Sequence, residues 1–192
     1  ARLVSEVGFP TGSVNVVCGS PQAIGEVFCQ DSRVRKLSFT GSTRVGKLLL
    51  GQAAADVKRC SMELGGNAPF IVFEDADLDS VIEGMLIAKF RNSGQTCIAA
   101  NRILVHSAVF EQVIDKICTR IHQLNTGDGF DDSTDIGPLI TPTAAQNINQ
   151  KVDEAITAGA QFVGGTRVRG HFFKPLVISG IPTQTSLWTD EV

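Results

Sequence analysis

Short apolar runs alternate along the chain with longer stretches in which apolar residues recur every three or four positions. The first pattern predicts strands and the second predicts helices. The predicted strands are 14–17, 36–40, 59–62, 70–73, 102–106 and 162–163, with 70–73 buried and a hairpin-like stretch at 172–178. The predicted helices are 21–29, 78–90, 110–124 and 143–158, with one more whose apolar face is Val45, Leu48, Leu49 and Ala53. Strands that alternate with helices indicate an α/β protein with mainly parallel sheets.

Local signals mark where elements begin and where the chain divides. Ser20 is the N-cap candidate for the helix at 21–29, and Asp77 stands at the start of the helix at 78–90. Between two strand-like runs, the segment 63–69 holds two Gly and one Pro, a composition that suits a crossing between domains. We predict one domain at 1–65 and a second at 66–192, with the boundary near Gly66.

Composition limits the class of protein. Hydrophobic residues make up 43% of the 192 positions, enough for a core, and a net charge of −3 without a basic block argues against a nucleic-acid partner. No apolar run is long enough to span a bilayer, and no signal peptide opens the sequence. Five cysteines without C-x-x-C spacing suit a reducing compartment, so we expect a cytoplasmic protein, with the mitochondrial matrix as the alternative. The three histidines show no metal-ligand spacing, so no metal is expected.

Both ends of the sequence lack the features of a natural terminus. It begins without Met at 1–4, where the residues read as the tail of a helix. It stops at 190–192 without a helix end or a polar tail. We therefore interpret it as an internal piece of a longer protein, with a complete small domain as the alternative.

Two glycine-rich segments carry the candidate chemistry. Cys97 ends the run 90–97, which reads FRNSGQTC, and Glu63 opens the run 63–67, which reads ELGGN. A thiol can carry an acyl group, and a carboxylate can activate water to release it. The alternative for each residue is structural, since a lone Cys is usually a small buried hydrophobe and a Glu beside two Gly is usually a turn residue. Cys97 differs from the other four cysteines because Gly-Gln-Thr precedes it and small residues follow at 99 and 100.

A strand-to-helix junction at 39–46, which reads FTGSTRVG, is the candidate phosphate site. Gly41 makes the turn into a helix, and a helix N-terminus presents free N–H groups and partial positive charge to phosphate oxygens. The Ser42 hydroxyl can add a hydrogen bond, and Gly46 permits close packing of the helix on its neighbour. The alternative is an ordinary capped helix, because this spacing of glycines is a weak motif by itself.

Taken in order, FTGST at 39–43, ELGGN at 63–67 and GQTC at 94–97 resemble the motif series of the NAD(P)-dependent aldehyde dehydrogenases, and the likeness spans essentially the whole chain. The resemblance implies a partial Rossmann-like cofactor domain joined to an α/β catalytic domain. It also implies NAD or NADP as the cofactor and a homo-oligomer at full length, and it implies that these residues alone are inactive. The cofactor-binding residues it implies are Gly41, Ser42, Gly46, Leu64 and Glu191, the last at the start of the family's E-x-F-G-P motif.

Within that family, the segments 67–79 and 89–97 are most similar to the succinate-semialdehyde dehydrogenases. Arg91, six residues before Cys97, is then the candidate that binds the distal carboxylate of a short aldehyde with bidentate geometry. A surface or interdomain salt bridge is the alternative role for Arg91, and glutarate semialdehyde is the alternative substrate. Several of these enzymes have a second cysteine where this chain has Ala99, so we expect the regulatory disulfide of the family to be missing.

The resemblance also implies the course of the reaction. The Cys97 thiolate attacks the aldehyde, the Cys97 N–H and an upstream Asn stabilise the alkoxide, and Glu63 activates water to hydrolyse the thioester that hydride transfer leaves. Two other classes stay open: a different thiol enzyme, such as an acyltransferase or a cysteine hydrolase, and a non-catalytic relative with a structural or binding role. The first would need a His base near Cys97, and no His pattern suggests one. The intact Cys97 and Glu63 argue against the second.

Overall fold

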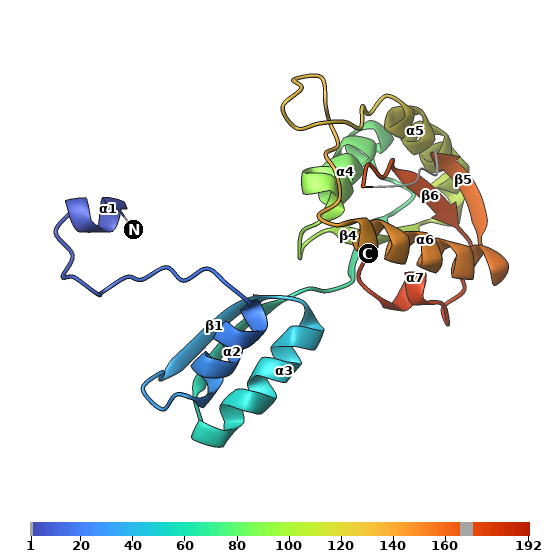
Figure 1. The fold of residues 1–192 in the computed structure, drawn as a ribbon. Helices are drawn as coiled ribbons and strands as arrows, with labels where there is room; N and C mark the ends of the chain where they lie inside the picture. Colours follow the sequence, from blue (N-terminus) through green and yellow to red (C-terminus); the bar gives the residue numbers. More distant parts are fainter. Residues whose placement is uncertain (1, 166–170) are drawn as a thin grey trace. The chain divides into compact units, whose positions relative to one another are not determined.

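The computed structural model describes residues 2–165 and 171–192 and divides the chain into two compact units (Figure 1). Unit 1 comprises Ala1–Leu64 and unit 2 comprises Gly65–Val192. Among the described residues, helices alternate with strands and two of the three strand pairs are parallel, which confirms the α/β class. The assignment of 1–65 to cofactor binding and 66–192 to catalysis stays a prediction.

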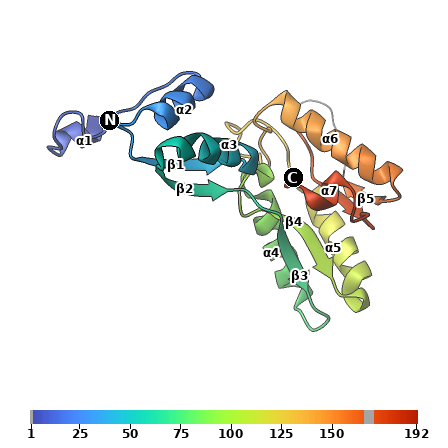
Figure 2. The same cartoon turned by 90° about the horizontal axis from the view of Figure 1, so that it is seen from below.

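Unit 1 contains one pair of parallel strands and three helices. Its elements are α1 (Arg2–Glu6), α2 (Pro21–Gln30), β1 (Lys36–Gly41), α3 (Thr43–Ala53), the 3-10 turn η1 (Ala54–Asp56) and β2 (Arg59–Leu64). Strands β1 and β2 lie side by side (Figure 2), from Lys36 opposite Arg59 to Gly41 opposite Leu64. The Ser20 side chain accepts a hydrogen bond from an N–H of the first turn of α2 at 3.4 Å, which confirms it as the N-cap.

The core of unit 1 is small. Its buried apolar side chains come from α2, β1 and α3 and are Cys29, Leu37, Leu49 and Ala53. Burial raises the pKa of the Cys29 thiol, because the thiolate would lose its solvation there. The predicted apolar face of α3 is wrong at Leu48, which is 55% exposed. The helix instead buries Gly46 together with Leu49 and Ala53.

The strand predicted at 14–17 is wrong. These residues form no strand, and Val16 and Val17 are 70% and 65% exposed. A strand needs a neighbour for its backbone N–H and C=O groups, and in the described part of unit 1 the strands β1 and β2 pair with each other alone. The apolar run therefore has no strand to join there.

Unit 2 contains a parallel pair, an antiparallel pair and the helices around them. Its elements are β3 (Ala68–Val72), α4 (Leu78–Phe90), the 3-10 turns η2 (Arg91–Gly94) and η3 (Ser107–Val109), β4 (Ala100–Val105), α5 (Phe110–His122), α6 (Pro142–Thr157), β5 (Gln161–Gly165), β6 (Leu176–Ser179) and α7 (Ser186–Thr189). The chain passes from β3 through α4 to the parallel strand β4, the crossover that parallel strands require. Helix α4 has the predicted bounds, and Asp77 caps it by accepting a hydrogen bond from the Asp79 N–H at 3.3 Å.

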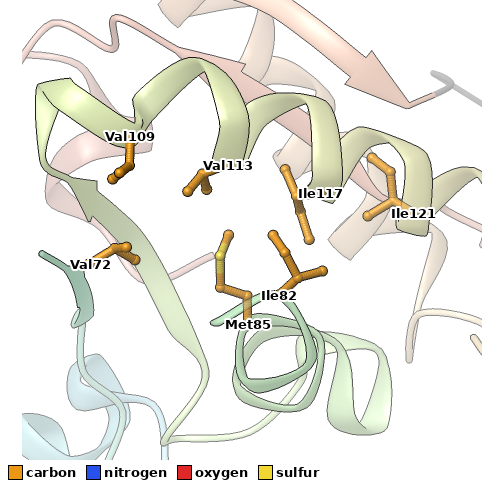
Figure 3. Close-up of a cluster of buried hydrophobic side chains, with 7 residues drawn as sticks. All are labelled: Val72, Ile82, Met85, Val109, Val113, Ile117 and Ile121. Carbon is orange, nitrogen blue, oxygen red and sulfur yellow. The ribbon is translucent and has the colours of Figure 1, made fainter. Parts of the chain in front are cut away.

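The core of unit 2 lies between α4, α5 and β3 (Figure 3). Side chains along η3 and α5 point toward two side chains of α4, with one from β3 beside them. These seven residues are Val72, Ile82, Met85, Val109, Val113, Ile117 and Ile121. On α5 the buried positions recur every four residues, which places them on one helix face. This cluster holds α4, and with it the start of the loop that follows α4, against the rest of unit 2.

Two predictions in unit 2 need correction. The strand at 70–73 is buried on one face only: Val72 is 2% exposed, whereas Ile71 and Phe73 are 57% and 64% exposed. The stretch at 172–178 is not a hairpin by itself, because it leads into β6, which pairs antiparallel with β5. For 70–73, a short continuous apolar run fits a strand buried on one face as well as a strand buried on both faces. The sequence pattern therefore could not distinguish the two.

Candidate functional site

The candidate cofactor residues of unit 1 meet at one edge of its strand pair. Gly41 ends β1 opposite Leu64, which ends β2, and Thr40 lies opposite Glu63. Because the strands are parallel, these carboxyl ends share an edge, the usual place for ligands in open α/β sheets. Glu63 is exposed, and no hydrogen bond or ion pair joins its side chain to another residue that the structure describes.

Helix α3 begins at this edge, directly after the turn at Gly41. The exposed Ser42 accepts a hydrogen bond from the Val45 N–H at 3.4 Å. Other N–H groups of a first helical turn have no partner within the helix, so they suit phosphate oxygens. A side chain added at Gly46 would overlap that of Leu64, so the glycine lets β2 pack closely on α3. The structure thus brings Gly41, Ser42, Gly46 and Leu64 together in unit 1.

Cys97 lies in unit 2, in the loop between α4 and β4. Just before it, Asn92, Ser93 and Gly94 have left-handed backbone angles, with φ of 53°, 58° and 77°. Glycine adopts such angles freely, whereas Asn and Ser do so at a cost of about 1–3 kcal/mol each, so the surrounding structure must hold them. One such contact is the hydrogen bond that the Ser93 hydroxyl donates to the Gly137 carbonyl at 3.0 Å.

Gln95 is a second anchor of this loop, and the sequence analysis did not single it out. Its side-chain oxygen accepts a hydrogen bond from the Ile140 N–H at 2.8 Å, and its amide nitrogen donates to the Pro138 carbonyl at 3.4 Å. An amide side chain can donate and accept at once, so Gln95 ties the loop to main-chain groups on either side of Leu139. Its place inside the GQTC run was the signal that could have identified it.

The Cys97 residue is exposed, whereas Ala99 and Ala100 are 3% and 4% exposed. The loop therefore buries its end in unit 2 and leaves Cys97 open to solvent. Exposure alone does not distinguish Cys97, because Cys18 is exposed as well. What distinguishes it is the loop that Ser93 and Gln95 hold in place.

Arg91 directly follows α4. It is exposed, and no hydrogen bond or ion pair joins its side chain to another residue that the structure describes. A salt bridge, the alternative role considered for it, is therefore not seen in the described part of the chain. Its planar guanidinium is available to an anion near the Cys97 loop.

Glu191 packs against the turn that precedes β3. A side chain added at Gly65 would overlap the Glu191 carboxylate, so this approach requires the glycine. Cys97, Arg91 and Glu191 belong to unit 2, whereas Glu63 and the edge at α3 belong to unit 1. The structure thus groups the candidate residues within each unit, and the base and the nucleophile belong to different units.

Lys89 also escaped the sequence analysis. It follows Ile82 by seven residues and Met85 by four on α4, so it continues the buried apolar stripe of that helix. Burial lowers the pKa of Lys89 to about 8, because the ammonium loses solvation, and the nearby Glu191 carboxylate opposes this change. A charged residue within an apolar stripe was the signal that the sequence offered.

His106 and His122 make ordinary contacts. His106 lies 3.6 Å from Glu74, and His122 forms a hydrogen bond with the Cys118 carbonyl at 2.6 Å. Among residues 2–165 and 171–192, no group of three or more His, Cys, Asp or Glu side chains could hold a metal ion. In the same part of the chain, no helix has both the length and the apolar character needed to cross a bilayer.

Comparison with known proteins identifies the family. The sequence profile of the aldehyde dehydrogenase family matches residues 1–192. The chain is 43% identical to the NADP(+) succinate-semialdehyde dehydrogenase GabD of Escherichia coli, over 100% of this chain and 40% of that protein. It is 42% identical to a glutarate-semialdehyde dehydrogenase of Pseudomonas putida, over 99% of this chain and 40% of that protein.

A solved structure agrees with these relatives. The crystal structure of succinate-semialdehyde dehydrogenase from Burkholderia pseudomallei matches this fold with a TM-score of 0.94 at 42% identity, over 99% of this chain and 40% of that one. The chain thus spans about 40% of the length of the relatives it matches. A profile match over every residue, at this level of identity and structural similarity, shows that the chain belongs to the aldehyde dehydrogenase family.

Proposed function

We propose that a protein containing this chain oxidises a short aldehyde with a distal carboxylate to the acid, with NAD or NADP as the oxidant and a thioester on Cys97. The observation that carries the proposal is the exposed Cys97 on a loop that Ser93 and Gln95 tie to 137–140. A nucleophile must be accessible, and it must be held still to attack a bound carbonyl efficiently. Membership of the aldehyde dehydrogenase family supports the same chemistry.

The edge of unit 1 suits the cofactor. The N–H groups of the first turn of α3 and the exposed Ser42 hydroxyl offer donors to a diphosphate, and Gly41 and Gly46 let backbones approach closely. Leu64 completes this edge, and Glu191 would contact the nicotinamide ribose from unit 2. When bound, the nicotinamide supplies the hydride acceptor. On this proposal, residues 1–65 form the end of the cofactor domain and 66–192 form the catalytic domain.

The remaining steps belong to the chain's own residues. The Cys97 thiolate attacks the aldehyde carbon, and the Cys97 N–H stabilises the alkoxide of the resulting thiohemiacetal. After oxidation, Cys97 carries a thioester. The Glu63 carboxylate takes a proton from the water that attacks this thioester, which releases the acid and restores the thiolate.

Arg91 supports a carboxylated substrate. An exposed guanidinium without a partner in the described chain can bind a carboxylate through two parallel hydrogen bonds. Succinate semialdehyde is the favoured substrate and glutarate semialdehyde the alternative. Identities of 43% and 42% to relatives named for these two aldehydes do not separate them.

Location and assembly follow from the same proposal. All five cysteines are free, which suits a reducing compartment. We therefore propose a cytoplasmic enzyme, or one of the mitochondrial matrix if the source is eukaryotic. At full length, we propose a homo-oligomer.

The test is a pair of substitutions in a full-length protein that contains this chain. Cys97→Ser should lower aldehyde oxidation by more than about 10⁴-fold, because a hydroxyl is a far weaker nucleophile at neutral pH. Glu63→Gln should keep a burst of NAD(P)H in the first turnover but slow the steady rate by about 10²- to 10⁴-fold, because deacylation stalls. Stopped-flow absorbance measures both.

Cys18→Ser is the matched control, because Cys18 is exposed like Cys97 but lies outside the loop. It should leave both phases unchanged. A normal steady rate in Glu63→Gln would contradict the assignment of the base. Normal oxidation by Cys97→Ser would contradict the proposed function as a whole.

A further inference from the structure

A network of polar contacts in unit 2 joins the end of α4 to the segment 188–192, and Lys89 is its centre. The Lys89 ammonium donates hydrogen bonds to the Asn101 side-chain oxygen at 2.7 Å and to the Val192 main-chain carbonyl at 2.9 Å. Hydrogen bonds from a charged donor are stronger than those between neutral groups, more so where the donor is partly buried. One side chain thus fixes two segments that are far apart in the sequence.

Asn101 extends the network toward the strands. It is the second residue of β4, which begins three residues after Cys97. While its oxygen accepts from Lys89, its amide nitrogen donates to the Gly66 carbonyl at 3.4 Å. Asn101 therefore links the strand that follows Cys97 to the turn at 65–67.

That turn is also the surface on which the Glu191 carboxylate packs, against Gly65. Asn67 in the same turn donates a hydrogen bond to the Trp188 carbonyl at 2.8 Å. The Arg102 guanidinium lies over the Trp188 ring, 5.8 Å from its centre. The segment is thus held at residue 188 by the turn and at residue 192 by Lys89. Between these points Lys151 pairs with Asp190 at 3.2 Å and donates a hydrogen bond to the Glu191 carbonyl at 3.2 Å, so Lys89 supplies the contact on the far side of Glu191.

We propose that Lys89 is a positioning residue for the cofactor: by joining Val192 to Asn101, it fixes the Glu191 carboxylate where the nicotinamide ribose binds. The inference rests on the proposed function, which assigns Glu191 to the ribose. In this role Lys89 contacts neither the cofactor nor the aldehyde, and its effect passes through the segment 190–192. A lysine with a merely structural role would stabilise unit 2 and leave cofactor affinity unchanged.

The first measurement compares Lys89→Met with the wild type in a full-length protein that contains this chain. Methionine keeps an unbranched stem and removes the three donors. Binding of NADH and NADPH is followed by fluorescence without aldehyde, and KM is measured for the cofactor and for succinate semialdehyde. We expect cofactor Kd and KM to rise about tenfold, with the aldehyde KM and the rate of Cys97 labelling by a thiol reagent changed less than about twofold.

Lys116→Met is the matched control. Lys116 is another lysine of unit 2, which pairs with the exposed Asp79 at 2.6 Å and has no contact with the segment 188–192 in the described structure. The substitution removes the same charge and the same donors. Cofactor binding should not change.

A double-mutant cycle with Glu191→Gln decides whether Lys89 acts through Glu191. If it does, Glu191→Gln weakens cofactor binding less in the Lys89→Met protein than in the wild type. Lys89→Arg keeps a charged donor and should recover part of the affinity. If Lys89→Met does not fold, Asn101→Ala removes its partner instead and should raise the cofactor Kd in the same direction.

Three results would overturn the proposal and leave the proposed function intact. The first is that Lys89→Met and Glu191→Gln affect cofactor affinity independently. The second is that Lys89→Met changes the KM of the cofactor and of the aldehyde equally. The third is that Asn101→Ala leaves the cofactor Kd unchanged. A wild-type protein that binds neither NADH nor NADPH would overturn the proposed function itself. The two failures are therefore distinguishable.

Discussion

Unit 1 and unit 2 hold their candidate residues in different ways. In unit 1, Ser42 caps α3 by bonding a main-chain N–H three residues later. In unit 2, Ser93 reaches Gly137, 44 residues away, and Lys89 reaches Val192, 103 residues away. A phosphate-binding edge can be built by a strand-to-helix junction and its glycines, whereas a loop with left-handed Asn and Ser needs contacts from distant segments.

The hydrophobic cores of the two units also differ in size. The buried cluster of unit 1 has four residues, and that of unit 2 has seven, four of them along η3 and α5. A larger cluster buries more apolar surface. Helix α4, which leads into the Cys97 loop, is therefore better anchored than α3, which precedes Glu63. We therefore expect the two units to respond separately to substitution. Changes in unit 1 should alter cofactor binding, and changes around the Cys97 loop of unit 2 should alter the reaction with the aldehyde.

The largest expected effect tests this separation in the cores. Ile117 is 4% exposed. The substitution Ile117→Ala should lower the free energy of unfolding by about 2–5 kcal/mol, because it removes buried apolar surface and leaves a cavity. Leu49→Ala is the matched change in unit 1, where Leu49 is 9% exposed. Hydrogen exchange is measured by mass spectrometry on the full-length protein. Exchange should become faster in 65–192 for Ile117→Ala and in 1–64 for Leu49→Ala. Equal acceleration in both units would mean that they unfold as one body.

Arg91→Ala should have the next largest effect, on the aldehyde alone. Loss of a charge-assisted contact worth about 1.5–3 kcal/mol should lower kcat/KM for succinate semialdehyde about ten- to a hundred-fold. Butanal has no carboxylate and should lose little. Arg91→Lys should recover part of the loss, since an ammonium keeps the charge but not the planar fork. Equal losses for the two aldehydes would make Arg91 structural and leave the substrate open.

Gly46→Ala should have the smallest effect, on the cofactor alone. The new methyl group would overlap Leu64, and such overpacking costs about 1–3 kcal/mol. We expect weaker binding of NADH or NADPH and an unchanged preference between succinate semialdehyde and butanal. Gly51→Ala is the matched control on the same helix: its methyl group meets nothing within 4 Å, so it should be neutral or slightly stabilising. Weakening by both substitutions alike would show that the Leu64 contact is not the cause.

Much of the local structure was predictable from the sequence. Helix α4 has the predicted bounds, 78–90, because an Asp cap and an apolar stripe both act within a few residues of each other. The predicted cap at Ser20 was confirmed for the same reason. The strand at 14–17 failed because apolar character does not supply a neighbouring strand.

The candidate site likewise has features that short runs of sequence predicted and contacts that they did not. The chemistry of Cys97 and Glu63 and the junction at Gly41 were visible as residue types within short runs. The partners of Gln95 and Lys89 were not, since Ile140 and Val192 carry no local sign of either contact. That the Arg91 side chain has no partner among the described residues likewise became apparent only in the folded chain.

The sequence by itself determined the order of helices and strands, the caps and glycine turns, and which side chains offer a nucleophile, a base and a phosphate edge. These depend on backbone geometry and on contacts within about four residues, which the order of residues encodes directly. The tertiary structure alone decided which apolar faces are buried, which strands pair, and how Lys89 comes to join Asn101 and Val192. Such contacts depend on bringing distant segments together, and burial then sets their strength and the lowered pKa of Lys89.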